Sequence, residues 1–251
     1  IDTIVLDHHE ISDQLPDAVA CINPARSDCS FPFKHLAGVG IAFNFLIALR
    51  GTLRKEGFWK DDRYPNLKEY LDVVALGTIG DIAPLVGENR IFAKIGLELI
   101  TEGKRPGIKA LKEVSGIDGQ LIDSFKASFC LIPRINAAGR IASPLDAVHL
   151  LLAENLEEAR PLAEKLDLHN RRRQAMERDI LNEILGKLGA NPDLENMNSL
   201  VFSSDKWHPG VVGIVASRLV DLFSRPTFVI SLKDGVGKGS GRSVSDFNIH
   251  K

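Results

Sequence analysis

The sequence predicts an α/β protein in which part of a parallel-sheet domain is joined by a long helix to a second, smaller α/β domain. Three observations carry this prediction. The apolar triplet Ile4–Leu6 is followed at once by polar residues 7–9, a pattern typical of the carboxyl end of a buried parallel strand. The highly charged residues 156–188 keep one apolar stripe at helical spacing. Residues 200–232 then alternate between strand and helix patterns.

The first domain is expected to contain mainly helices after its strand. Hydrophobic spacing places these helices at residues 36–50, 67–76 and 89–100, with another ending near Gly116. Two segments are expected to be irregular. Residues 77–81 contain two closely spaced glycines, which weaken both helix and strand and predict a turn. Residues 133–144 are rich in Asn, Ala and Gly and predict a loop.

The second half of the chain begins with the long helix and ends in the smaller domain. Residues 189–198, rich in Gly, Asn and Pro, predict a linker. The elements predicted after it are a strand at 200–202, a helix at 211–223, a strand at 227–232 and a Gly-rich strand or turn at 236–243. We therefore expect three parts, namely residues 1–154 in the sheet domain, 155–190 as connecting helix and linker, and 191–251 as an incomplete smaller domain.

Composition excludes several classes of protein. With 251 residues, 44% of them hydrophobic and 25% charged, the chain has the composition of a globular protein. A formal net charge of −2 means that any nucleic-acid surface must be a local patch. Three cysteines without C-x-x-C spacing favour a reduced, cytoplasmic protein over a disulfide framework. The longest uncharged run, Leu36–Leu49, is too short for a membrane span, so we expect no membrane partner.

Two short segments offer ligands for a hard metal ion. Asp7-His8-His9 puts a carboxylate and two imidazoles at a strand end. Because successive side chains on a strand point in opposite directions, one histidine can bind a metal while the other faces a substrate. Asp81 lies among apolar residues, where a carboxylate is costly unless it is paired or metal-bound. A solvated loop for the tripeptide and a capping or turn role for Asp81 remain open alternatives.

Two stretches offer groups that can bind phosphate. Arg134, Asn136 and Arg140 lie among small residues, and arginine matches the geometry of phosphate. Surface arginines on a flexible loop explain this stretch equally well. In Gly239–Ser243 the glycines permit a nest of backbone N–H groups, to which serine and arginine add donors. The absence of a following Gly-Lys-Ser/Thr disfavours nucleoside triphosphate hydrolysis.

Two further features each have two explanations. Trp207 and His208 precede a predicted helix start that can receive an anion, and Trp207 can stack on a base. A buried structural tryptophan is the alternative. Residues Arg171–Arg173 lie on the long helix, where they form either a solvated face or the border of a nucleic-acid cleft.

Six sequence motifs follow one another along the chain in an order that is characteristic of one protein family. They are Val5–His9, Ala75–Leu85, Gly87–Arg90, Pro133–Arg140, Trp207–Leu219 and Gly239–Ser243. Together they resemble the DHH phosphoesterase superfamily, and within it the RecJ-type exonuclease branch, over nearly the whole chain. The resemblance implies two Mn²⁺ or Mg²⁺ ions and hydrolysis of phosphodiester bonds in single-stranded DNA from the 5′ end, in DNA repair and recombination.

The resemblance also implies a role for each candidate residue. His8 and Asp81 would ligate the metal, His9 would contact the scissile phosphate, and Asp7 would orient the histidines. Ser240 and Arg242 would hold the phosphate at the 5′ end. The implied substrate-binding residues are Arg134, Asn136, Arg140, His208, Ser240, Gly241, Arg242 and Ser243.

Several sequence motifs of the family are not found among these 251 residues. The family's aspartate motifs that precede Asp-His-His are missing, as are a later glycine-histidine motif and the oligonucleotide-binding domain. We therefore expect residues 1–154 to be the C-terminal part of a DHH domain, and the chain to be a fragment that is inactive or nearly so by itself.

The same resemblance leaves two alternatives. One is a small-substrate enzyme, either an oligoribonuclease or a cyclic-dinucleotide phosphodiesterase, and the other is a non-catalytic replication scaffold. Gly87–Arg90 and Trp207–Gly210 argue against the small-substrate enzymes. The intact Asp7-His8-His9 and Asp81 argue against a scaffold, which needs no metal ligands. Single-stranded DNA is the expected partner, and a single-strand-binding protein or a helicase is a further candidate.

Overall fold

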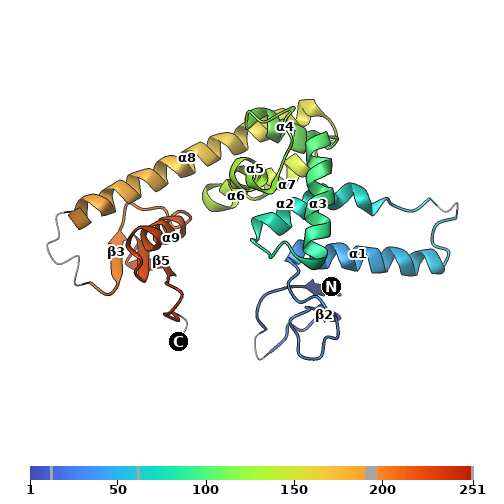
Figure 1. Ribbon diagram of the computed structural model, residues 1–251, viewed down its shortest axis with the longest axis horizontal. Coiled ribbons are helices and arrows are strands. Elements are labelled where there is room, and N and C mark those ends of the chain that lie inside the picture. The colour runs from blue at the N-terminus through green and yellow to red at the C-terminus, as the bar shows by residue number, and fades with distance from the viewer. Residues whose placement is uncertain (12–13, 61–62, 190–196, 250–251) are drawn as a thin grey trace. The chain divides into compact units, whose positions relative to one another are not determined.

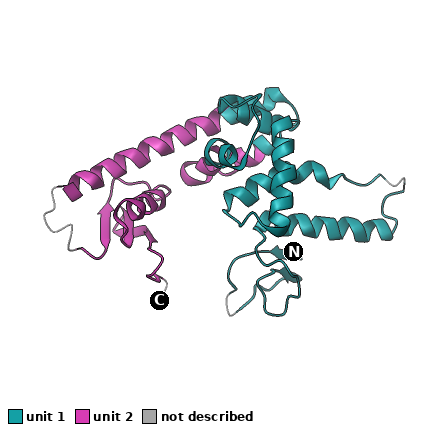
Figure 2. Cartoon of the chain, in the orientation of Figure 1, with its two compact units in different colours: residues 1–133, 150–163 teal, residues 134–149, 164–251 magenta. Residues whose placement is uncertain are grey.

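The computed structural model describes residues 1–11, 14–60, 63–189 and 197–249 (Figure 1). The chain divides into two compact units (Figure 2). Unit 1 comprises residues 1–133 and 150–163, and unit 2 comprises residues 134–149 and 164–251. Helices and two small sheets confirm the predicted α/β class. Within the described residues, no helix is both long enough and apolar enough to cross a membrane.

Most of the secondary-structure elements are helices. Up to residue 131 they are β1 (Ile4–Leu6), β2 (Ala20–Ile22), α1 (Gly38–Lys55), the 3₁₀ helix η1 (Leu67–Tyr70), α2 (Leu71–Gly80), α3 (Gly87–Glu102), α4 (Pro106–Val114), α5 (Ser124–Lys126) and the π-helical turn η2 (Ala127–Leu131). The later elements are α6 (Ile132–Ile141), α7 (Leu145–Leu152), α8 (Leu156–Gly189), β3 (Leu200–Ser204), α9 (Val212–Phe223), β4 (Thr227–Lys233) and β5 (Val236–Arg242).

Unit 1 places a short parallel sheet beside a helical core. Strands β1 and β2 pair in parallel, with Leu6 opposite Ile22, and the Asp7 N–H extends the pairing by donating to the Ile22 carbonyl at 3.0 Å. The core of this unit gathers apolar side chains from α1, η1, α2 and α3. Its buried members are Leu36, Ile41, Phe43, Leu67, Leu71, Val74 and Phe92.

The turn predicted at residues 77–81 is wrong, because α2 continues to Gly80. A Cβ at Gly77 would lie 2.7 Å from a methyl of Val39, and one at Gly80 would lie 3.2 Å from a methyl of Ile132. The two glycines therefore let neighbouring helices approach α2 closely instead of breaking it. Asp81 is the residue that ends the helix.

The loop predicted at residues 133–144 is also wrong, because most of it forms α6. Ala137 and Ala138 are fully buried, so these small residues serve helix packing. The π-helical turn η2 ends at Leu131, two residues before Pro133, whose missing N–H interrupts the regular pattern of helical hydrogen bonds.

Unit 2 contains a mixed three-stranded sheet in the order β3-β4-β5. Strands β3 and β4 are parallel, and β4 and β5 are antiparallel. Helix α9 packs on β4 and β5, and part of α8 completes the core through Ile180, Ile184 and Leu188. The predicted long helix, the β3-α9-β4 alternation and the Gly-rich strand are confirmed. Most of the predicted linker, residues 190–196, lies outside the described residues.

Candidate metal centre and phosphate site

The Asp7-His8-His9 turn is organised by a single carboxylate oxygen. Asp7 Oδ1 accepts hydrogen bonds from the backbone N–H groups of His8 at 2.8 Å and His9 at 3.3 Å. The same oxygen lies 2.7 Å from Nδ1 of the His9 ring. Both histidines lie beyond the last strand residue, Leu6, so strand alternation does not separate them, and their ring centroids are 4.4 Å apart.

The Asp7–His9 contact shifts the pKa of both partners. The hydrogen bond with the His9 side chain, helped by the two backbone N–H groups, lowers the pKa of Asp7. The same hydrogen bond and the negative charge of Asp7 raise the pKa of His9. The His9 side chain is 77% exposed. The turn therefore favours an ionised carboxylate that supports a protonated imidazole open to solvent.

His8 and Asp81 come together from distant parts of unit 1. The Nδ1 atom of His8, at the end of β1, lies 3.5 Å from Oδ2 of Asp81, at the end of α2. The His8 ring also lies against the start of α1, where a Cβ on Gly38 would be 3.5 Å from its Cδ2. An imidazole nitrogen and a carboxylate oxygen at this separation, both partly open to solvent, can ligate one divalent cation.

The described residues bring together few side chains that can ligate a metal. Nowhere in the described parts of the chain do three or more His, Cys, Asp or Glu side chains gather as metal ligands. His8 and Asp81 fit a metal by their chemistry and proximity, but they supply only two ligands. A six-coordinate Mg²⁺ or Mn²⁺ would need further oxygen ligands.

Sequence reasoning missed Asn23, which holds the backbone of the histidine turn. Its Nδ2 donates to the His9 carbonyl at 2.9 Å, and its Oδ1 accepts from the Ala25 N–H at 2.8 Å. Asn23 is buried, so replacing it would leave unpaired polar groups beside the turn. The available signal was Asn-Pro directly after a short apolar strand, a pair that favours turns.

Asn89 plays a similar part for the segment after Asp81. This fully buried side chain donates from Nδ2 to the carbonyls of His35 at 2.6 Å and Pro84 at 3.1 Å. It thereby joins the chain leading into α1 to the chain leaving Asp81. Gly87–Arg90 was singled out as a motif, but its sequence alone does not show which residue makes these contacts.

A candidate phosphate site in unit 2 lies where α9 meets β5. Arg242 donates from Nη1 to Ser240 Oγ at 2.8 Å and from Nε to Ser217 Oγ at 3.2 Å. A Cβ on Gly213, in the first turn of α9, would lie 3.1 Å from Ser240 Oγ and 3.6 Å from Arg242 Nη2. Ser240 and Arg242 thus lie beside the first turn of α9, and the first backbone N–H groups of a helix have no intrahelical acceptors.

The glycines of this segment do not form the predicted nest. Residues 236–242 are strand β5, whose backbone pairs with β4. A Cβ on Gly239 would lie 2.8 Å from an Ile230 carbon, and one on Gly241 would lie 2.6 Å from Ile249 Cδ1. The nest prediction is wrong because the glycines make room for packing. Ser243 is engaged elsewhere, with its hydroxyl donating to the Phe247 carbonyl at 2.5 Å.

The residues predicted on α6 fall into two groups. Asn136 and Arg140 are exposed and four residues apart on the helix, so they share a face. Arg134 is instead mostly buried, and its Nε donates to Asp167 Oδ1 at 2.9 Å. Asn136 and Arg140 are thus open to solvent on one face of α6, whereas Arg134 holds α6 to α8.

The segment that carries His208 packs directly on the end of α6. A Cβ on Gly210 would lie 2.0 Å from the Arg140 carbonyl oxygen, so only glycine fits there. His208 Nδ1 accepts from the Gly210 N–H at 3.1 Å. Trp207 is buried and donates to Glu183 Oε2 at 2.9 Å, so it belongs to the core and does not offer a face for base stacking.

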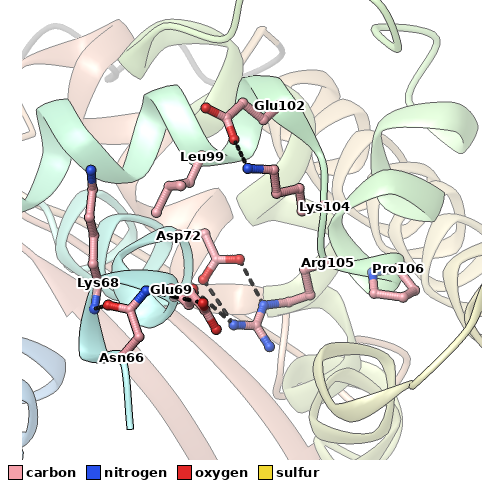
Figure 3. Close-up of a pocket in the computed structure, with 9 residues that line it drawn as sticks. All are labelled: Asn66, Lys68, Glu69, Asp72, Leu99, Glu102, Lys104, Arg105 and Pro106. Carbon is pink, nitrogen blue, oxygen red and sulfur yellow. Dashed lines mark hydrogen bonds and ion pairs between the residues drawn. The ribbon is translucent and has the colours of Figure 1, made fainter.

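One pocket in unit 1, of about 530 Å³, contains none of the predicted site residues (Figure 3). Arg105 crosses it and pairs with Asp72 through Nε at 2.7 Å and Nη2 at 3.1 Å. Arg105 also donates to the carbonyls of Leu151 and Glu69, both at 3.3 Å. Its donors are already used within the protein, so this pair clamps the start of α2 to the loop before α4.

Comparison with known proteins shows which proteins this chain resembles. Residues 1–78 match the N-terminal domain of the DHH family. Over 99% of its length the chain is 47% identical to the single-stranded-DNA-specific exonuclease RecJ of Salmonella typhimurium, covering 44% of that protein. It is 41% identical to RecJ of Bacillus subtilis over 99% of the chain and 30% of that protein.

Solved structures agree as well. A crystal structure of exonuclease RecJ bound to manganese matches 99% of the chain and 58% of its own length, with a TM-score of 0.80 and 34% identity. RecJ from Thermus thermophilus in complex with Mg²⁺ matches 98% of the chain and 35% of its own length, with a TM-score of 0.79 and 34% identity. Residues 1–78 are thus similar to the N-terminal domain of the DHH family, and the chain as a whole is similar to one part of the RecJ exonucleases. It spans less than half the length of the curated relatives named here.

Proposed function

We propose that this chain forms part of a divalent-metal-dependent exonuclease that removes nucleotides from the 5′ end of single-stranded DNA in DNA repair and recombination. The observation that carries the proposal is the approach of His8 to Asp81 beside the Asp7–His9 turn. The named relatives are single-stranded-DNA-specific exonucleases, and solved relatives bind Mn²⁺ or Mg²⁺, which supports the same interpretation of the residues.

His8 and Asp81 would hold a metal ion, because neutral imidazole and carboxylate are both ligands of Mn²⁺. In the complete site we propose two ions, Mn²⁺ or Mg²⁺, which when bound supply a hydroxide nucleophile and offset the charge of the phosphate. His9 would donate a hydrogen bond from its exposed ring to a phosphate oxygen. Asp7 would favour the protonated form of that ring, since it raises the pKa of His9, and their hydrogen bond would orient the ring.

The phosphate site of unit 2 would hold the 5′ end of the strand. Arg242, Ser240 and the first turn of α9 present donors to one space, and a terminal phosphate carries more charge than an internal diester. Asn136 and Arg140 would contact internal phosphates from the exposed face of α6. Such contacts hold a strand without reading its bases.

The decisive test uses the full-length gene product and a labelled single-stranded oligonucleotide with Mn²⁺. We expect turnover by the wild type and a loss of about a hundredfold or more in His8→Ala. His149→Ala is the matched control, because His149 is an exposed histidine on α7 outside the proposed sites. Equal turnover by wild type and His8→Ala would refute the metal-binding role.

The same assay separates the alternatives. Faster hydrolysis of dinucleotides or cyclic dinucleotides than of the oligonucleotide would indicate a small-substrate enzyme, and binding without turnover would indicate a scaffold. We also propose that the protein acts in the cytoplasm with a single-strand-binding protein or a helicase. The division into residues 1–154, 155–190 and 191–251 is likewise a proposal, which limited proteolysis can test.

A further inference from the structure

Helix α2 ends in a conformation that is unusual for the residue that adopts it. The Ile82 N–H donates to the Ile79 carbonyl at 3.1 Å, and the Ala83 N–H donates to the Thr78 carbonyl at 3.2 Å. This pair of bonds is the Schellman motif, which requires a left-handed residue just after the helix. That residue is Ile82, with φ of +57°.

Isoleucine is a poor choice for this position. A left-handed backbone brings the Cβ of an L-residue too close to the carbonyl oxygen, and branching at Cβ makes the crowding worse. Elsewhere in unit 1, α3 ends with Gly103 at φ of +68°. The other non-glycine residues with positive φ in the described chain are Ser224 and Asp234, which are small or polar. Ile82 is the one β-branched residue among them.

No packing within unit 1 compensates for this strain. Ile82 is 90% exposed as a residue, so the chain itself removes little of its apolar surface from water. A glycine here would relieve the strain and lose almost no contact. Strained residues of this kind gather at functional sites, where the side chain serves something other than stability.

The position of Ile82 indicates what that function is. It follows Asp81 directly, so the two Cα atoms are about 3.8 Å apart. The Asp81 carboxylate in turn lies 3.5 Å from His8. A nucleotide whose phosphate reaches His8 and Asp81 would therefore lie beside the stretch of chain that carries Ile82.

We propose that Ile82 is a substrate-contact residue, whose side chain packs against the sugar or base of the nucleotide bound beside His8 and Asp81. This contact rests on the proposed function. An apolar side chain suits it because base faces are open in a single strand and covered by stacking in a duplex. Such a contact also tolerates any base.

The test compares Ile82→Gly and Ile82→Val in the full-length gene product, with Ile91→Ala as the control because Ile91 is an exposed isoleucine on α3. We expect Ile82→Gly to raise Tm by about 2–8 °C as the strain is relieved. We expect its KM for a single-stranded oligonucleotide to rise about 3- to 10-fold with little change in kcat. Ile82→Val should keep both values near those of the wild type, and Ile91→Ala should keep KM.

A higher Tm together with a higher KM supports the contact, because a purely structural residue would not move the two in this way. A higher Tm with unchanged KM overturns the contact and leaves the proposed function intact. A lower Tm overturns it as well, since the side chain would then contribute to folding. If the wild type does not hydrolyse the oligonucleotide at all, the proposed function fails, and this contact fails with it.

Discussion

Arg242 offers the sharpest test of how the chain would bind the end of a strand. Its Nε and Nη1 atoms donate to Ser217 and Ser240, and Nη1 also donates to the Gly241 carbonyl at 2.7 Å. Nη2 is the guanidinium nitrogen nearest to Gly213 in the first turn of α9. Existing bonds thus fix the guanidinium, and Nη2 lies beside the first turn of α9, where we propose that a phosphate binds. Replacing Arg242 by alanine removes this donor and one positive charge.

The expected cost follows from the bonds that are lost. A hydrogen bond to a charged group contributes about 1.5–3 kcal/mol, and the exposure of Arg242 places the loss in the lower part of that range. We take about 2 kcal/mol, which corresponds to about thirtyfold in kcat/KM. A 5′-hydroxyl strand has no terminal phosphate to bind, so its kcat/KM should change much less.

The assay measures kcat/KM for 5′-phosphorylated and 5′-hydroxyl strands of one sequence, in the full-length wild type and Arg242→Ala. Arg178→Ala is the control, because Arg178 is an exposed arginine on α8 outside the proposed sites. The ratio between the two substrates should collapse in Arg242→Ala and persist in the control. An equal loss on both substrates would show that Arg242 is a general backbone contact, and the end-recognition argument would fail.

Three further predictions concern unit 1. Asp81→Asn should lower kcat by about a hundredfold or more while leaving the Kd for single-stranded DNA nearly unchanged, and a parallel loss of both would assign it a structural role. Asp7→Asn should lower the midpoint of the His9 titration, followed by NMR on the metal-free chain, because the carboxylate that raises its pKa is gone; an unchanged midpoint would contradict the contact. Gly96→Ala should destabilise the protein by about 2–3 kcal/mol, because the added Cβ would lie 2.2 Å from the Leu71 carbonyl oxygen. Denaturant unfolding measures this loss, and an unchanged midpoint concentration of denaturant would contradict the packing.

Local signals were sufficient for the regular elements of the fold. The apolar stripe of residues 156–188 predicted α8 to within one residue at its end, because helical periodicity persists over many turns. The strand-helix-strand pattern after residue 200 likewise predicted β3, α9 and β4. The α/β class followed from these two features and the polar end of β1.

The errors share one physical cause, which is the treatment of small residues as breakers of structure. Gly77 and Gly80 were taken for a turn, and Gly239 and Gly241 for a nest, yet each is placed where a Cβ would collide with a neighbouring side chain. A glycine that permits close packing and one that permits a left-handed turn look the same in a sequence. The neighbour that decides between them is distant in the chain.

The same limit explains which functional residues were found and which were missed. His8 and Asp81 carry their chemistry in their own side chains, so their type and order along the chain pointed to them before their 3.5 Å contact was known. Asn23 and Asn89 act through backbone groups, among them the carbonyls of His9, His35 and Pro84, the farthest of which is 54 residues away in the chain. The sequence did not single out Ile82, because the neighbouring residue types predict neither its φ of +57° nor its exposure. Candidate ligands can therefore be proposed from residue type and from the order of motifs along the chain, whereas the contacts of Asn23 and Asn89 and the left-handed backbone of Ile82 become visible only in the structure.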